Sequence, residues 1–333
     1  MAIPNNESPH RARTPWWLMA LLILVQLSSG LRDMPQAAFF LIYLQEQFEL
    51  VPAVISGIVA GAQVAGMIVA LLGGVVSARL GSAGVLMLGL ALSGLSSLAF
   101  QLQSTSLAAA LWLAGGAGMA LTTVGGASFL TRLSGRRALG VLTAFYALSM
   151  TIGGAIGNPL AGALIEQHGF GVFGWAAMAV SGVAILIVAV LMAPLEPRGE
   201  ASATTTGRIL ALGALPALRI PRVRLLVGLR CLPTIFYGML SVLIPLLLHE
   251  RSGSKALVAG YGTTMLIVAS AAQLLAGRAA DRWGARRPTL AAYTALVFAG
   301  LGLAVSVGAA WGRVWGCLCS AYWAMRRPGR CPP

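Results

Sequence analysis

The sequence predicts an all-α membrane protein built from two copies of one helical unit. Hydrophobic residues make up 58% of the 333 residues, charged residues make up 10%, and the mean hydropathy is +0.83. Soluble domains carry about 25% charged residues, so the composition excludes that class. The segment Gly-Leu-Arg-Asp-Met-Pro at Gly30 recurs as Gly-Leu-Arg-Cys-Leu-Pro at Gly228, which indicates an internal duplication.

Nine stretches of the chain are long and apolar enough to cross a bilayer. About 20 residues at 1.5 Å each span about 30 Å of hydrocarbon. Backbone polar groups must be satisfied within such a stretch, so each is predicted to be a helix. The predicted spans are residues 17–44, 52–77, 84–102, 107–130, 139–165, 172–193, 225–248, 257–276 and 289–309.

The basic residues between the spans predict the orientation. Along an alternating path, the arginines of the gaps gather on one side, and Arg251 and Lys255 lie on the other. The arginine-rich side is expected to be cytoplasmic, in a plasma membrane such as the bacterial inner membrane, with the N-terminus inside. The net charge of +14 is therefore interpreted as a topology signal and not as nucleic-acid binding.

Two repeats predict the domain organisation. The first has an offset of 198 residues (228 minus 30) and the second, between Gly74 and Gly277, an offset of 203 (277 minus 74). Both indicate one duplication of a six-span unit. The expected order is a cytoplasmic tail (1–15), an N-terminal six-helix bundle (16–193), a cytoplasmic linker (194–224), a partial C-terminal bundle (225–309) and an aberrant tail (310–333).

The second repeat carries a loop motif. After the eighth span the chain reads Gly-Arg-Ala-Ala-Asp-Arg-Trp-Gly-Ala-Arg-Arg, and the residues that form the motif are Gly277, Asp281, Arg282, Gly284, Arg286 and Arg287. This run resembles the cytoplasmic loop signature of the major facilitator superfamily. The first copy, with Gly74, Arg79 and Gly81, is degraded because Ala78 replaces the acid.

The resemblance implies a fold and a function. It implies two six-helix repeats, of which this chain supplies about nine or ten of the twelve helices, and transport of a small molecule by alternating access. We expect a monomer in the bilayer without a cofactor, with protons as a possible coupling ion. By analogy with the family, Asp281 should face the start of the fifth span near Arg136, Arg137 and Leu139 and act as a conformational switch; otherwise it only solvates a turn and sets topology.

Three charged residues fall inside predicted spans: Arg32 and Asp33 in the first and Arg230 in the seventh. An intramembrane charge costs roughly 2.5–3.5 kcal/mol on insertion scales, so it is a functional-site hypothesis by default. Arg32 and Asp33 point about 100° apart on a helix, so we expect them not to pair directly and each to need a partner on another helix.

These charges support alternative functions. Arg32 and Arg230 together would bind a carboxylate or phosphate, which predicts an organic anion or organophosphate transporter; structural or gating roles are the alternative. Asp33 is the candidate proton carrier because burial favours its neutral form and a nearby arginine its ionised form. The competing interpretation is a permanently ionised partner of Arg230 or Arg32.

The fifth span contains a glycine-proline segment. Gly153, Gly157, Pro159 and Gly162 resemble the helix-bending motif of antiporters in the superfamily, although Asn158 interrupts the Gly-Pro pair. This slightly favours proton-coupled efflux over import, and plain helix packing explains the segment nearly as well. Polar residues that could line a cavity or bond between helices are Gln26, Gln36, Gln63, Gln273, Tyr146, Tyr237 and Asn158.

The end of the chain does not fit the family pattern. Three of the four cysteines crowd into residues 317–331 with Arg, Pro, Gly and Trp, which suggests a frameshifted or truncated gene; a natural short form is the alternative. A transport-dead fragment, or a receptor on the same fold, would then be the competing function. Neither a metal-ligand spacing nor a nucleophile arrangement is present, so we expect no metal site and no enzyme.

Overall fold

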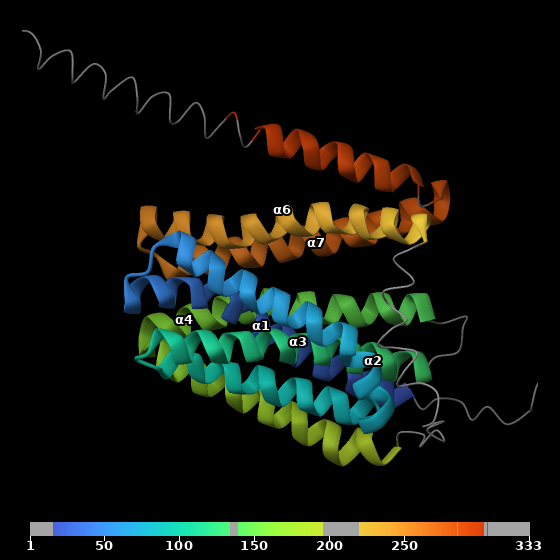
Figure 1. The fold of residues 1–333 in the computed structure, drawn as a ribbon, viewed down its shortest axis with the longest axis horizontal. Helices are drawn as coiled ribbons and strands as arrows, with labels where there is room; N and C mark the ends of the chain where they lie inside the picture. Colours follow the sequence, from blue (N-terminus) through green and yellow to red (C-terminus); the bar gives the residue numbers. More distant parts are fainter. Residues whose placement is uncertain (1–15, 134–138, 196–219, 285, 303–304, 306–333) are drawn as a thin grey trace, which may run out of the picture. The chain divides into compact units, whose positions relative to one another are not determined.

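The structure, a computed structural model, describes residues 16–133, 139–195, 220–284, 286–302 and 305. Every regular element in these ranges is helical, which confirms the all-α class (Figure 1). The long helices are α1 (Trp16–Phe48), α2 (Pro52–Ser96), α3 (Thr105–Leu133), α4 (Leu139–Ile187), α6 (Pro221–Ser252) and α7 (Lys255–Trp283). Short pieces are η1 (Ser97–Gln101), a π-helical turn η2 (Val188–Met192) and η3 (Ala193–Leu195).

Glycines in the left-handed region divide two of the long helices. Gly81 has φ 75° inside α2, and Gly169 has φ 84° inside α4. A side chain would be strained at such a backbone angle, so glycine is the residue that permits these reversals. Each glycine falls in a predicted gap, between the second and third and between the fifth and sixth spans. The sequence therefore located both connections.

Six helical stretches are long and apolar enough to cross a membrane among the described residues, compared with nine predicted spans. The difference has identifiable causes. The fifth and sixth spans form one stretch, Phe145–Met192, of 48 residues. The predicted seventh span lies within α6, whose described side chains give a shorter apolar segment, Leu240–Glu250. Residues 286–302 are helical and overlap the predicted ninth span, and most of the rest of that span lies outside the described residues.

By its contacts the chain divides into two units, Met1–Ser270 and Ala271–Pro333. In the first unit α2 packs mainly on α3, and α1 packs mainly on α4. The predicted linker falls mostly, and the predicted tail 310–333 wholly, outside the described residues, as do Arg136 and Arg137. The site described below lies entirely in the first unit.

Glycines bring α1 and α4 into backbone contact. A Cβ atom on Gly30 would run into the Met150 carbonyl, and one on Gly153 or Gly157 would run into the carbonyl of Leu27 or Leu31. Small residues allow helices to approach this closely in a membrane, where packing drives association. The main chain of α4 stays helical at Pro159, and its interruption lies at Gly169. The predicted glycine segment thus sets the approach of α4 to the part of α1 that carries Arg32 and Asp33.

Candidate functional site

A cavity of about 680 Å³ opens among the helices of the first unit. Residues of α1, α2, α3, α4, α6 and α7 line it, and most of them are apolar or small. Ligand sites for small molecules are commonly 300–1,000 Å³. Asp33 carries the one charged side chain among the described residues of the lining. The cavity is therefore the candidate substrate site.

Arg32 and Asp33 form a direct ion pair, which corrects the expectation that they could not pair. Arg32 Nε donates to Asp33 Oδ1 at 2.7 Å, and Arg32 Nη2 lies 2.7 Å from the same oxygen. Their side chains are 1% and 9% exposed. The expectation failed because it considered only the directions of the Cα–Cβ bonds. The arginine side chain is long enough to bring its guanidinium back over the neighbouring carboxylate.

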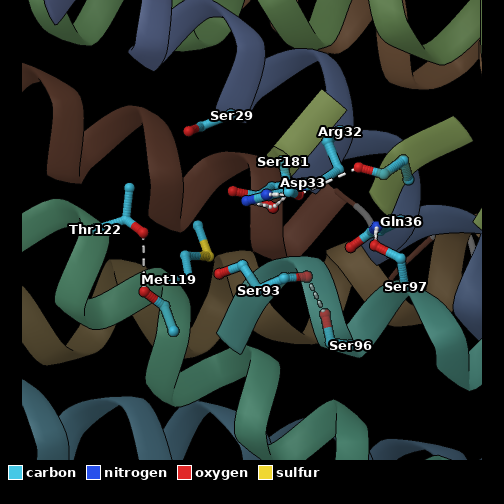
Figure 2. A network of polar contacts seen from close by, with 12 residues as sticks. Ser29, Arg32, Asp33, Gln36, Ser93, Ser96, Ser97, Met119, Thr122 and Ser181 are labelled. Carbon is cyan, nitrogen blue, oxygen red and sulfur yellow. Dashed lines mark hydrogen bonds and ion pairs between the residues drawn. The ribbon is translucent and has the colours of Figure 1, made fainter. Parts of the chain in front are cut away.

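Arg32 also has a partner on another helix, as predicted. Its Nη1 donates a hydrogen bond to Ser181 Oγ, in the part of α4 that follows Gly169 (Figure 2). Ser181 in turn donates to the Ala177 carbonyl at 3.2 Å. Arg32 is absent from the lining of the large cavity, whereas Asp33 belongs to it. Asp33 therefore faces the cavity, and Arg32 is held away from it by its hydrogen bond to Ser181.

The polar side chains that were proposed from the sequence and that the structure describes separate into two groups. Gln36, Gln63 and Asn158 line the cavity, and Gln36 Nε2 donates to Ser97 Oγ in η1. Gln26 and Tyr146 are buried elsewhere. The side chains of Gln273 and Tyr237 lie outside those that the structure describes.

Asn158, the residue that interrupts the predicted Gly-Pro pair, contacts α7. A Cβ atom on Gly262 would meet Asn158 Nδ2, so the glycine makes room for the amide. Asn158 is 3% exposed, and its Oδ1 has no hydrogen-bond partner among the described residues. A buried amide oxygen without a hydrogen-bond partner is energetically costly.

Arg230, the third predicted charge, lies in α6, and its side chain is not among those described. The surroundings of Asp281 and Gly277 in the loop motif, and of Gly74 in its first copy, also lie outside what the structure describes. Arg79 is exposed at the connection within α2. Arg282 lies in the last turn of α7, and Arg286 and Arg287 are the first residues of the helical stretch 286–302. The predicted contact of Asp281 with the fifth span thus stays a prediction.

A second group of charged residues gathers at the end of α1. Glu46 Oε1 lies 2.9 Å from His249 Nε2 of α6, and Glu46 Oε2 lies 3.0 Å from Lys255 Nζ of α7. Lys255 also lies over the Phe170 ring of α4, 4.6 Å from its centroid. Nearby, Gln45 Nε2 donates to Glu250 Oε1 at 3.0 Å, and the backbone N–H of Ala256 donates to Glu166 Oε1 at 2.9 Å. We call Glu46, His249 and Lys255 the end cluster.

Sequence reasoning missed the end cluster and the role of Ser181. The end cluster joins residues about 200 positions apart, in what were expected to be solvated gaps. Its only sequence signal is that acids and bases occur in two gaps on the same predicted side of the membrane. Ser181 is one small polar residue in an apolar run, and no pattern marks it.

The two copies of the loop motif share a backbone feature. Gly81 in the first copy and Gly284 in the second, 203 residues apart (284 minus 81), have φ angles of 75° and 74°. Both occupy the second glycine position of the motif, at a backbone angle that favours glycine. The family model described as the Major Facilitator Superfamily matches residues 18–325.

The chain belongs to the Major Facilitator Superfamily.

Solved structures of low sequence identity were also found to resemble this chain. A D-xylose-proton symporter matches with a TM-score of 0.61 and 16% identity, over 80% of this chain and 69% of the symporter. A bacterial homologue of the human drug peptide transporters matches with a TM-score of 0.42 and 18% identity, over 78% of this chain and 54% of the other. No curated protein matches. The first likeness shows the shared fold, and the chain is a multi-pass membrane protein of a transporter family.

Proposed function

We propose that this superfamily member is a proton-coupled secondary transporter that exports a small molecule by alternating access. Asp33 is the group that carries the proton, and Arg32 is its positioning partner. The observation that supports this most strongly is the position of the Arg32–Asp33 pair, with the acid on the cavity wall and the base buried behind it.

Protonation of Asp33 would change the energy of this arrangement. An ionised carboxylate compensates the buried guanidinium, and a protonated one leaves that charge without its counter-ion. An uncompensated buried charge is strongly destabilising, so the buried pair and its surroundings would rearrange when the proton binds. Because Arg32 also binds Ser181, a rearrangement would change how α1 contacts α4. The protonation state of Asp33 would thereby be linked to the packing of α1 on α4.

The end cluster supports a closed arrangement at one end of the first unit. Contacts of Glu46 with His249 and Lys255 join α1 to α6 and α7. In the predicted orientation this end faces the outside of the cell. We infer that the cluster closes the outer end, and that its opening is one step of alternating access. Ion pairs near the protein surface contribute about 0.2–1 kcal/mol each, which is small enough to open reversibly.

The organic-anion alternative has less support. An anion site would need the Arg32 guanidinium on the cavity wall, and that group instead contacts Asp33 and Ser181. Export as the direction is supported by the resemblance of the segment around Gly157 to an antiporter motif. The close packing of that segment on α1 also explains its glycines.

Proton flux in proteoliposomes tests the proposal. Vesicles containing the full chain and a trapped pH-sensitive dye would receive a panel of compounds: a sugar, a dipeptide, an organic anion, a neutral aromatic compound and an organic cation. We expect at least one compound to move protons with the wild-type chain and none with Asp33→Asn. The control is Glu49→Gln, which removes an exposed carboxylate and should behave as the wild type. Proton flux that is the same in Asp33→Asn would refute the role of Asp33.

A further inference from the structure

We infer that the cavity binds hydrophobic organic cations, such as a quaternary ammonium ion or a protonated amine on an apolar body. The inference names the substrate class of the cavity and rests on the proposed function for its biological meaning. It is carried by three features of the described residues: the charge of the lining, the kind of apolar side chains in it, and the geometry of the Arg32–Asp33 pair.

The charge of the lining is the first feature. Asp33 is the single charged side chain among the described lining residues, and the remaining polar groups are amides and hydroxyls such as Gln36, Gln63 and Tyr261. A carboxylate in a low-dielectric wall attracts a cation more strongly than it would in water. Asp33 lines the cavity and Arg32 does not, so the negative member of this neutral pair is the nearer one and the lining favours a cation over an anion.

The geometry of the Arg32–Asp33 pair leaves one side of the carboxylate able to bind a cation. Both contacts of the guanidinium end on Asp33 Oδ1, so Oδ2 takes no part in the pair. Arg32 is held from its far side by Ser181, which fixes it behind the acid. A cation in the cavity can therefore approach the carboxylate on the side that Arg32 does not cover, without displacing Arg32.

The apolar part of the lining suits a bulky hydrophobic body. Four methionines, on α1, α2, α3 and α7, line the cavity: Met34, Met67, Met119 and Met265. Methionine side chains are flexible and polarizable, so they adapt to ligands of different shape. Trp112 also lines the cavity and is stacked on Phe40, with ring centroids 3.9 Å apart. An indole held in this way is the best of the aromatic side chains for binding a cation over its face.

Two further features limit the size and kind of the ligand. The volume of about 680 Å³ is enough for a molecule of drug size. Gly66 and Gly116 lie in the wall and let α2 pack closely on α3, because a Cβ atom added at either glycine would collide with backbone of the facing helix. A sugar would require a dense set of polar groups around it, and the described lining is instead mostly apolar.

Binding of matched probes to the full purified chain tests the inference. Tetraphenylphosphonium is a hydrophobic cation, tetraphenylborate is an anion of nearly the same shape, and triphenylphosphine oxide is a related neutral molecule. Equilibrium dialysis in detergent would measure the three affinities without any proton gradient. We expect the cation to bind about tenfold more tightly than either of the others. Equal or tighter binding of the borate, or no binding of the phosphonium at millimolar concentration, would overturn the inference.

Removing the acid and removing the base of the Arg32–Asp33 pair should change the affinity for the phosphonium in opposite directions. Asp33→Asn should weaken phosphonium binding by about tenfold and leave the neutral probe unchanged. Arg32→Gln should tighten phosphonium binding, because it removes the competing cation. The exposed Glu49→Gln is the matched control and should bind as the wild type. Unchanged phosphonium affinity in Asp33→Asn, or weaker affinity in Arg32→Gln, would contradict the inference.

A second comparison covers the possibility that Asp33→Asn fails to fold around an unpaired arginine. The double variant Arg32→Gln/Asp33→Asn removes both charges, and its affinity is compared with that of Arg32→Gln alone. A difference of about tenfold between them is expected for the phosphonium. Equal affinities would refute the role of Asp33. Dialysis requires no transport, so the two proposals can fail separately. Absence of proton flux with retained phosphonium selectivity would overturn the proposed function alone. Proton flux without phosphonium selectivity would overturn the inference alone.

Discussion

Arg32 and Ser181 lie 149 residues apart in the chain, and a hydrogen bond from the guanidinium to the hydroxyl joins α1 to α4. Both side chains are buried, at 2% and 1% exposure for the whole residues. The bond explains how a charge can be kept inside a helical membrane protein. The acid at position 33 compensates the charge, and the serine supplies an acceptor to a donor that Asp33 does not reach.

Ser181→Ala should therefore lower stability without changing the net charge of the site. Hydrogen bonds to charged groups contribute about 1.5–3 kcal/mol, and the lost acceptor leaves part of a buried guanidinium unsatisfied. Thermal unfolding in detergent, followed by tryptophan fluorescence, would measure the loss. Ser252→Ala is the control because Ser252 is exposed at the end of α6. If both variants unfolded at the wild-type temperature, the bond would have no structural importance.

The contact between α1 and α4 predicts the effect of a single methyl group. In Gly157→Ala the new Cβ would collide with the Leu31 carbonyl, whereas in Gly171→Ala it would meet nothing within 4 Å. Overpacking costs about 1–3 kcal/mol, so Gly157→Ala should lower the unfolding temperature. Gly171→Ala should match or slightly exceed the wild type because alanine favours helix. Equal stability of the two variants would show that the helices are not in close contact.

The loop motif predicts a strained substitution in both repeats. Gly81 and Gly284 have positive φ angles, and a left-handed conformation costs an ordinary residue roughly 1–2 kcal/mol. Gly81→Ala and Gly284→Ala should each reduce the yield of folded protein on size-exclusion chromatography. Gly57→Ala is the control, since its helical position has open space for a Cβ atom. Normal yields of both loop variants would contradict the backbone conformation described here.

The sequence was sufficient to predict the all-α membrane fold, but it was not sufficient to predict how the side chains of the site contact one another. Apolar runs of the right length predicted the helices, and the glycine reversals at Gly81 and Gly169 fell in the expected gaps, because these signals are local. The placement of Arg32 and Asp33 within an apolar span was also a local signal, and it correctly predicted that both side chains are largely buried. Their direct pairing was missed because it depends on the path of a flexible side chain.

Other parts of the site depend on packing that no local pattern encodes. Ser181 becomes the partner of Arg32 only because α4 lies against α1, and the end cluster exists only because α6 and α7 approach the end of α1. The lining methionines come from four helices and are unremarkable in the sequence. Such relationships require the relative positions of helices, which periodicity and charge counts do not give.

The end cluster predicts a change in conformational balance. Glu46→Gln removes the charge that both His249 and Lys255 contact. Each of these partly exposed contacts contributes at most about 1 kcal/mol, so the ratio of closed to open molecules should fall by at most about fivefold per contact. Spin labels at Gln47 and Ser252, in a chain whose four native cysteines are replaced by serine, would report the distance between α1 and α6.

We expect the longer label distances to become more populated in Glu46→Gln and to stay at the wild-type level in Glu49→Gln. Glu49 is exposed near the same end of α1, so it controls for a general loss of negative charge. An unchanged distance distribution in Glu46→Gln would mean that the end cluster does not hold these helices together.

The claim that Asp33 carries the coupled proton is tested most directly by comparing exchange with gradient-driven transport. In proteoliposomes, the wild-type chain should exchange labelled for unlabelled substrate and should also accumulate it when a pH gradient is imposed. Asp33→Asn should lose accumulation, and any exchange that it retains should be independent of pH, because the variant lacks the carboxylate that binds the proton. Accumulation by Asp33→Asn that follows the pH gradient as in the wild type would contradict the account.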